Sequence, residues 1–273
     1  MPVVNGFYFE NDDKYIHRLE YDLAGRGMHL QYDNGEEELY SFVTGEDLIR
    51  FDSARQPQWL RYGCLKMRET VRFITYDVPG KPHYECVTLV IDEENGLVTR
   101  VTTVFGEQPS RPVLATTRYE FGAVKRDGEP LPWKRHCETT ELTGKKIAWT
   151  YSGGFVNVHI YLDHFCRAQA LQRPEGDHSP LIDDPIYEEQ AHYIKIREHL
   201  YLFSNTEVHI NRRDPMAGGN NLLLLIDTDS MMDIGRNFRH LDATRREWGM
   251  LHAFGRWYDQ PLETEAAPSP NHI

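Results

Sequence analysis

The sequence predicts an all-β protein made of two antiparallel β-barrels in tandem. Three observations support this: a strong hairpin signal near the start, a second copy of the same segment in the middle, and short alternating strands at even spacing. No long stretch repeats apolar residues at helical spacing. Evenly spaced short strands favour a barrel or sandwich, and eight strands can close around one small ligand.

The hairpin signal lies in residues 26–37. An alternating run leads into Tyr32-Asp33-Asn34-Gly35, and a second run begins at Glu36. Asn-Gly between two such runs predicts a type I′ turn, in which both central residues have positive φ. We therefore expect a β-hairpin to begin the first barrel.

A second copy of this segment occupies residues 142–154. Leucine, glycine, tyrosine and the turn glycine keep their spacing, so that Tyr151 corresponds to Tyr32. Residues 70–76 likewise correspond to 199–205, and residues 89–92 to 224–227. A repeat of this length indicates two related domains rather than a solenoid.

We expect residues 1–140 to form the first barrel with its connector, residues 141–262 the second barrel, and residues 263–273 a disordered, Pro-rich tail. In the second half, residues 243–248 are expected to form one helical turn, and residues 255–258 could close the barrel. The strands expected in the first half are 28–32, 36–43, 47–52, 58–66, 70–77, 83–92, 97–105 and 113–121. Those expected in the second half are 146–152, 155–162, 165–171, 191–197, 200–209, 221–227 and 230–238.

Composition excludes several classes of function. A net charge of −12 argues against a nucleic-acid surface, and no apolar run is long enough to span a bilayer. The start lacks a secretory signal, and the four cysteines lack Cys-x-x-Cys spacing, which favours reduced thiols in the cytoplasm. Neither the spacing of the histidines nor the glycine-rich turns indicate a metal or a nucleotide cofactor. The expected partner is a small molecule, and a homo-oligomer is left open.

Candidate site residues lie in the second half. Alternation puts Trp149 and Tyr151 on one face of their strand, and His159 and Tyr161 on one face of the next, so these side chains could line a pocket. Positions facing solvent would fit the alternation equally well.

Three further side chains could carry chemistry. Glu207 and His209 share a face and could form a general acid/base pair, with an exposed strand edge as the alternative. Arg197 belongs to a cationic streak that could bind an acid group, although a solvated face explains the streak as well.

Several of these segments together resemble the MoaF family, which is named for molybdenum cofactor biosynthesis protein F. They are residues 30–35, their second copy at 143–154, residues 191–204 and residues 224–227. The resemblance covers residues 20–258 and implies a tandem of two lipocalin-like (calycin) barrels.

A more distant likeness is to phenolic acid decarboxylases, single-barrel enzymes with an aromatic-x-Tyr-acidic-Asn-Gly hairpin and a later Thr-Glu pair. It implies that tyrosines and an arginine hold the substrate carboxylate and that the glutamate moves the phenol proton. Tyr32 and Tyr151 match the hairpin tyrosine, and Thr206-Glu207 match the later pair. In the first half Val78 stands where the glutamate would be, which predicts a first barrel that binds without reacting.

The leading hypothesis is a cofactor-independent lyase or isomerase acting on a small aromatic or hydrophobic acid. Glu207 and His209 would move protons with Tyr151, while Trp149, His159, Tyr161, Arg197 and Tyr32 would bind the substrate. The alternative is a non-catalytic binding or accessory protein, for example one that holds a pterin-like intermediate of molybdenum cofactor assembly. A third possibility places the site in a cleft between the barrels, lined by Tyr8, Trp133, Trp248 and Trp257.

Overall fold

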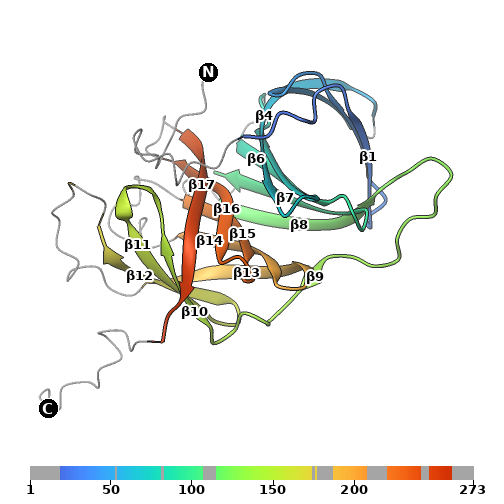
Figure 1. Cartoon of the computed structure of the whole chain (residues 1–273). Coiled ribbons are helices and arrows are strands. Elements are labelled where there is room, and N and C mark those ends of the chain that lie inside the picture. The colour runs from blue at the N-terminus through green and yellow to red at the C-terminus, as the bar shows by residue number, and fades with distance from the viewer. Residues whose placement is uncertain are drawn as a thin grey trace, which may run out of the picture.

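The chain folds into two closed antiparallel β-barrels of eight strands each, which confirms the predicted fold class (Figure 1). The computed structural model describes residues 19–52, 54–80, 83–106, 115–173, 176, 187–207, 220–240 and 246–259. Within these ranges, no helix has the length and apolar character needed to cross a membrane.

The first barrel follows chain order, with each strand hydrogen-bonded to the next. It closes where Tyr32 pairs with Gly122. A Cβ atom at Gly122 would lie 2.4 Å from the carbonyl oxygen of Gln31, so glycine permits the two strands to meet. The strands are β1 (Gly27–Tyr32), β2 (Glu37–Phe42), β3 (Asp47–Phe51), β4 (Pro57–Met67), β5 (Val71–Asp77), β6 (Tyr84–Asp92), β7 (Leu97–Phe105) and β8 (Ala115–Val124).

The second barrel repeats this order and closes where its first strand pairs with its last. A short strand, β9 (Cys137–Glu138), joins it from the connector by pairing with Ile194 and Lys195. The barrel strands are β10 (Lys146–Thr150), β11 (Val156–Tyr161), β12 (Phe165–Gln172), β13 (Tyr187–Arg197), β14 (Leu200–Glu207), β15 (Asn220–Asp227), β16 (Met232–His240) and β17 (Arg246–Trp257).

The last strand differs from the sequence prediction. Strand β17 already begins at Arg246, so the helical turn expected over 243–248 is wrong at residues 246–248. The strand pairs with β16 along one edge and with β10 along the other. Because both ladders satisfy its backbone groups, tertiary pairing outweighs the local helical preference of the charged residues before it.

The first hairpin is confirmed, but its turn is not type I′. Gly35 has a φ of 88° and its N–H donates to the Tyr32 carbonyl oxygen at 2.9 Å, whereas Asn34 does not have positive φ. Instead the Asn34 side-chain oxygen accepts the N–H of Glu36 at 2.9 Å. Asn34 therefore holds the turn through its side chain rather than through a left-handed backbone.

The duplication extends to individual positions. Strands β5 and β14 are the fifth strands of their barrels, and β6 and β15 end at Asp92 and Asp227. Strand pairing therefore assigns counterparts in the second barrel to many residues of the first.

The outer faces of the two barrels pack on each other through apolar side chains. Arg236 is fully buried there and donates to the hydroxyls of Thr88 and Thr103, each at 2.9 Å. The apolar cluster comprises Leu65, Met67, Val71, Phe73, Val90, Val101, Ile194, Ile196, Leu200, Leu202, Leu223, Leu225, Ile234 and Met250.

Two reciprocal ion pairs flank this seam. Arg68 of the first barrel donates twice to Asp227 of the second at 2.8 Å, and Arg197 of the second donates to Asp92 of the first. Arg68 and Arg197 occupy equivalent positions where the fourth strand of each barrel meets the hairpin turn to the fifth, so the contact resembles the isologous interface of a two-fold dimer.

Among the described residues, the two tryptophans predicted to line a cleft between the barrels do not take part in the packed seam. Trp133 and Trp257 are 86% and 51% exposed, away from the apolar cluster. Tyr8 lies outside the described residues, and the Trp248 side chain is likewise not described.

Candidate functional site

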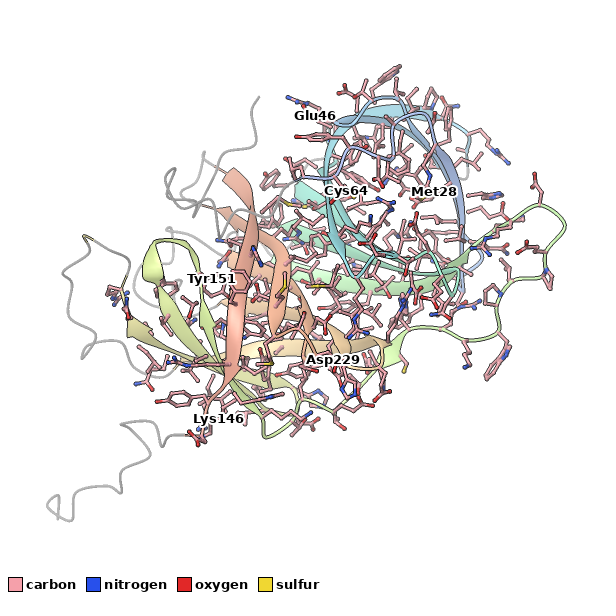
Figure 2. All side chains as sticks on the ribbon, in the orientation of Figure 1. Met28, Glu46, Cys64, Lys146, Tyr151 and Asp229 are labelled. Carbon is pink, nitrogen blue, oxygen red and sulfur yellow. The ribbon has the colours of Figure 1, made fainter. Side chains whose placement is uncertain are left out.

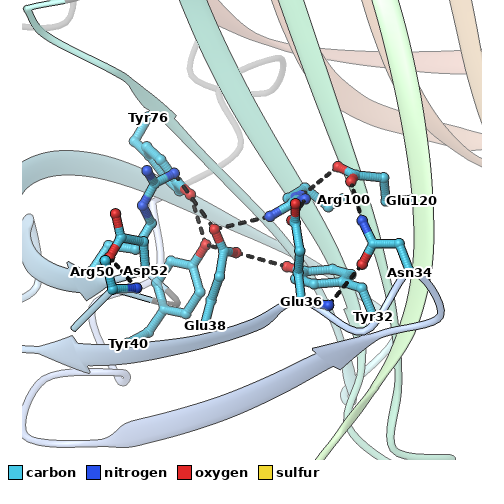
Figure 3. Close-up of polar contacts among 11 residues, drawn as sticks. Tyr32, Asn34, Glu36, Glu38, Tyr40, Arg50, Asp52, Tyr76, Arg100 and Glu120 are labelled. Atoms are coloured by element: carbon cyan, nitrogen blue, oxygen red, sulfur yellow. Dashed lines mark hydrogen bonds and ion pairs between the residues drawn. The ribbon is translucent and has the colours of Figure 1, made fainter. Parts of the chain in front are cut away.

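The interior of the first barrel holds a hydrogen-bonded network centred on Glu38 (Figure 3). One oxygen of this buried carboxylate accepts the hydroxyls of Tyr32 at 3.0 Å and Tyr40 at 2.7 Å. The other oxygen contacts Arg100 at 2.9 Å. The first barrel therefore has an inner carboxylate after all, supplied by β2 rather than from the position of Val78.

Tyr76 and Arg50 extend the network. The hydroxyls of Tyr40 and Tyr76 lie 2.7 Å apart, and Arg50 is hydrogen-bonded to Tyr76. Burial raises the pKa of Tyr76 to about 12, so this phenol stays protonated at neutral pH.

These polar groups satisfy one another. Arg100 also pairs with Glu120 at 2.6 Å and its guanidinium lies 4.2 Å from the centre of the Tyr32 ring. Of the buried side-chain polar atoms in this network, only Arg50 Nε has no partner among the residues that the structure describes. The first barrel is thus filled by its own side chains, and sequence reasoning had identified Tyr32 alone.

The second barrel brings four of the predicted site residues together. Trp149 Nε1 donates to the Tyr161 hydroxyl at 2.9 Å, and the His159 ring lies 6.1 Å from that of Tyr161. A Cβ atom at Gly255 would lie 2.5 Å from the Trp149 ring, so glycine makes room for the indole. Tyr151 is half-buried at the end of β10 (Figure 2).

His159 is held in its neutral form. Its side chain is 2% exposed, and burial lowers its pKa to about 4. An imidazole in this state can donate or accept a hydrogen bond but carries no charge at pH 7.

Asp233 on β16 is the group that the sequence did not suggest. It is fully buried, accepts the Tyr151 hydroxyl at 3.3 Å and is hydrogen-bonded to the Ala253 backbone. Burial raises its pKa to about 7 against these two hydrogen bonds, which lower it. Its second oxygen, Oδ1, has no partner in the described part of the chain. A carboxyl group that titrates near neutrality can both take and give a proton.

The counterparts of the first network are mostly small in the second barrel. The two barrels can be aligned from the aspartates that end β6 and β15. Leu89 and Leu224 each lie three residues before that aspartate. Leu89 pairs with Arg100, and Leu224 pairs with Gly235. Glycine therefore stands where the first barrel has its central arginine. The other strand pairings align six further positions. Each first-barrel residue and its second-barrel counterpart are Glu38 and Asn157, Tyr40 and His159, Arg50 and Ala168, Tyr62 and Ala191, Tyr76 and Asn205, and Glu120 and Leu251.

The smaller side chains leave polar atoms unpaired inside the second barrel. The buried side-chain atoms with no partner among the described residues are Asp233 Oδ1, Asn205 Oδ1, Asn220 Oδ1, Asn237 Oδ1 and His159 Nδ1. Buried polar groups in proteins are nearly always hydrogen-bonded, so this set indicates an interior that is completed by a bound molecule or ordered water. Solvent reaches the same face at Asn157, Ala168 and Ala170, which are partly exposed.

The other predicted residues lie elsewhere. Arg197 is the last residue of β13, where Asp92 and Glu94 bind its guanidinium, so it does not meet Tyr151. Glu207 ends β14, but its side chain is not described, and His209 lies outside the described residues. The Glu207 and His209 pair therefore stays a prediction.

A separate groove of about 390 Å³ lies outside the second barrel, beside β9 and β13. Its lining includes Glu138, Asp163, His164 and His192. Across the described ranges, no group of three or more such side chains is arranged to hold a metal ion.

Comparison with known proteins provides information on the second half of the chain. A search of curated proteins finds no match. The family model of the MoaF C-terminal domain matches residues 136–247, which run from the end of the connector into β17 and include Asp233. The second half of the chain therefore carries a MoaF C-terminal domain, which confirms the resemblance to the MoaF family there.

Proposed function

We propose that the second barrel binds a small aromatic or hydrophobic molecule and catalyses proton transfer on it, as a lyase or isomerase that needs no metal or nucleotide cofactor. The observation that carries this proposal is Asp233, a buried carboxyl group with a pKa of about 7 and one unpaired oxygen. Perturbed carboxyl groups of this kind are typical of general acids and bases.

In this proposal Asp233 Oδ1 removes a proton from one atom of the substrate. An isomerase would return the same proton to a second atom, and a lyase would return it to the carbon left by the departing group. Tyr151 donates to the other Asp233 oxygen and so stabilises the ionised form. Trp149 and Tyr161 form an aromatic wall for the substrate, while neutral His159 offers a further hydrogen bond.

The second candidate is a non-catalytic binding protein. The unpaired atoms of the second barrel support binding regardless of any reaction. The family name suggests molybdenum cofactor assembly, in which such a barrel would hold a pterin-like intermediate.

The test incubates the full chain with aromatic acids, pterins and phenols. Native mass spectrometry measures binding, and chromatographic separation of the released small molecules measures turnover, because an isomer has the same mass as its substrate. We expect wild type to convert a panel member, and Asp233→Asn to bind it while turning it over at least 100-fold more slowly, as loss of a general acid/base predicts. The rate should change with an apparent pKa near 7. Glu69→Gln, an exposed carboxylate outside both barrels, serves as the control and should retain full activity.

The same experiment separates the two candidate functions. If wild type and Asp233→Asn both bind the same compound and neither changes it, the binding protein replaces the enzyme. If Asp233→Asn converts the compound at the wild-type rate, Asp233 is not the acid/base.

A further inference from the structure

The unpaired atoms of the second barrel have a common chemistry. Four of the five are oxygens that accept hydrogen bonds, from Asp233 and three asparagines, each at most 6% exposed. A ligand that completes them must supply N–H or O–H donors. Leaving such acceptors unpaired in a low-dielectric interior is destabilising.

The unpaired acceptors lie at the two ends of a strip on the inner face of the second barrel. Asn237 is four residues after Asp233 on β16, roughly 13 Å along the strand. Asn205 lies two strands from Asn237, with Leu222 between them, roughly 10 Å away. Between the two ends the inner face is apolar, formed by Leu224, Gly235 and Leu251 with Phe203 beside them.

The described lining offers no free positive charge for a carboxylate. His159 is neutral, and Lys195, at the rim, is paired with Glu141 at 2.6 Å and Glu198 at 2.8 Å. Arg197 is bound in the seam. An anionic ligand would instead meet Asp233 and the asparagine oxygens.

We infer that the ligand of the second barrel is an uncharged, elongated aromatic molecule with hydroxyl or amino donors at both ends. The apolar strip binds its rings, and the Asp233 and Asn237 ends accept its donors. This inference rests on the proposed binding site and narrows its substrate class from small aromatic or hydrophobic molecules to neutral aromatic molecules that carry hydrogen-bond donors.

Three probes of the same shape test it by calorimetry: 4,4′-dihydroxybiphenyl, 4,4′-dimethoxybiphenyl and biphenyl-4,4′-dicarboxylate. We expect the dihydroxy compound to bind at least tenfold more tightly than either of the others. Asn237→Leu and Asn205→Leu should each weaken its binding at least tenfold and leave the dimethoxy compound unaffected. Thr102→Leu, at the first-barrel counterpart of Asn237, is the matched control and should change neither.

Tighter binding of the dicarboxylate, equal binding of the dimethoxy compound, or no binding of any probe would overturn the inference. These outcomes differ from failure of the proposed enzyme, because selectivity among the probes does not depend on turnover. A preference for the dicarboxylate would restore an acid as the substrate and leave the role of Asp233 to its own test.

Discussion

Wild type is expected to lose stability as the pH rises, because Asp233 gives up a proton that the folded state binds tightly. Replacing Asp233 with asparagine is expected to abolish this loss. The Asp233 pKa is raised from 3.8 to about 7 by burial, so the folded state binds this proton more tightly than the unfolded state. A raised carboxyl pKa stabilises the fold at acidic pH, and this contribution is lost between about pH 4 and pH 7. At about 1.36 kcal/mol per pKa unit, the loss is roughly 4 kcal/mol.

The measurement is urea unfolding of wild type and Asp233→Asn at pH 4, 6 and 8. The unfolding free energy of the variant minus that of wild type should increase as the pH rises and level off above pH 7. Comparing the two proteins cancels the other titrating groups. Parallel pH profiles would show that Asp233 has an ordinary pKa and would remove the basis of its catalytic role.

Replacing Arg197 with alanine is expected to destabilise the fold by about 3 kcal/mol, because it leaves Asp92 buried without its main partner. Asp92 is fully buried. Burial alone would raise its pKa, but hydrogen bonds from Arg197 and Asn95 outweigh this and lower it. The reciprocal pair of Arg68 and Asp227 should behave similarly.

The control for Arg197→Ala lies two residues earlier on the same strand. Lys195 pairs with the exposed carboxylates of Glu141 and Glu198, so Lys195→Ala should cost less than about 1 kcal/mol. Chemical denaturation of Arg197→Ala, of Asp92→Asn and of the double variant, each compared with wild type, measures the coupling between Arg197 and Asp92. Lys195→Ala is measured in the same way as the control. Equal, small effects of Arg197→Ala and Lys195→Ala would mean that the seam depends on its apolar cluster alone.

The fold was largely predictable because alternation and repetition are local signals. Counting residues in twos put His159 and Tyr161 on one face of their strand and Trp149 with Tyr151 on one face of the strand before it, and the structure shows that these faces are the inner ones. The two copies of the hairpin indicated that the two barrels share one strand order. The turn at Asn34 was assigned the wrong type because a side-chain hydrogen bond can replace a left-handed backbone. Strand β17 was missed in part because pairing on both edges is a long-range effect.

The site was harder to predict because its chemistry depends on what surrounds each group. Asp233 follows two methionines and belongs to no motif; only burial makes it titrate near pH 7. Glu38 and Tyr40 do alternate on β2, which could have placed them inside the first barrel. Gly235 can be interpreted only when strand pairing shows that it occupies the position equivalent to Arg100 of the first barrel.

We expect the second barrel to hold the ligand, because the first is filled by its own side chains. The test is calorimetric measurement of binding, using the compound that wild type binds most tightly. The first variant is Ala191→Tyr, which introduces the side chain that Tyr62 has at the equivalent position of the first barrel. Ala168→Leu, at a partly exposed inner position, provides a second variant that fills the barrel. Tyr40→Phe alters the first barrel as the comparison.

We predict that each filling variant, with a thermal unfolding transition confirming that it is folded, loses binding at least tenfold, while Tyr40→Phe binds like wild type. Unchanged binding in the filling variants together with loss in Tyr40→Phe would contradict the account and place the ligand in the first barrel.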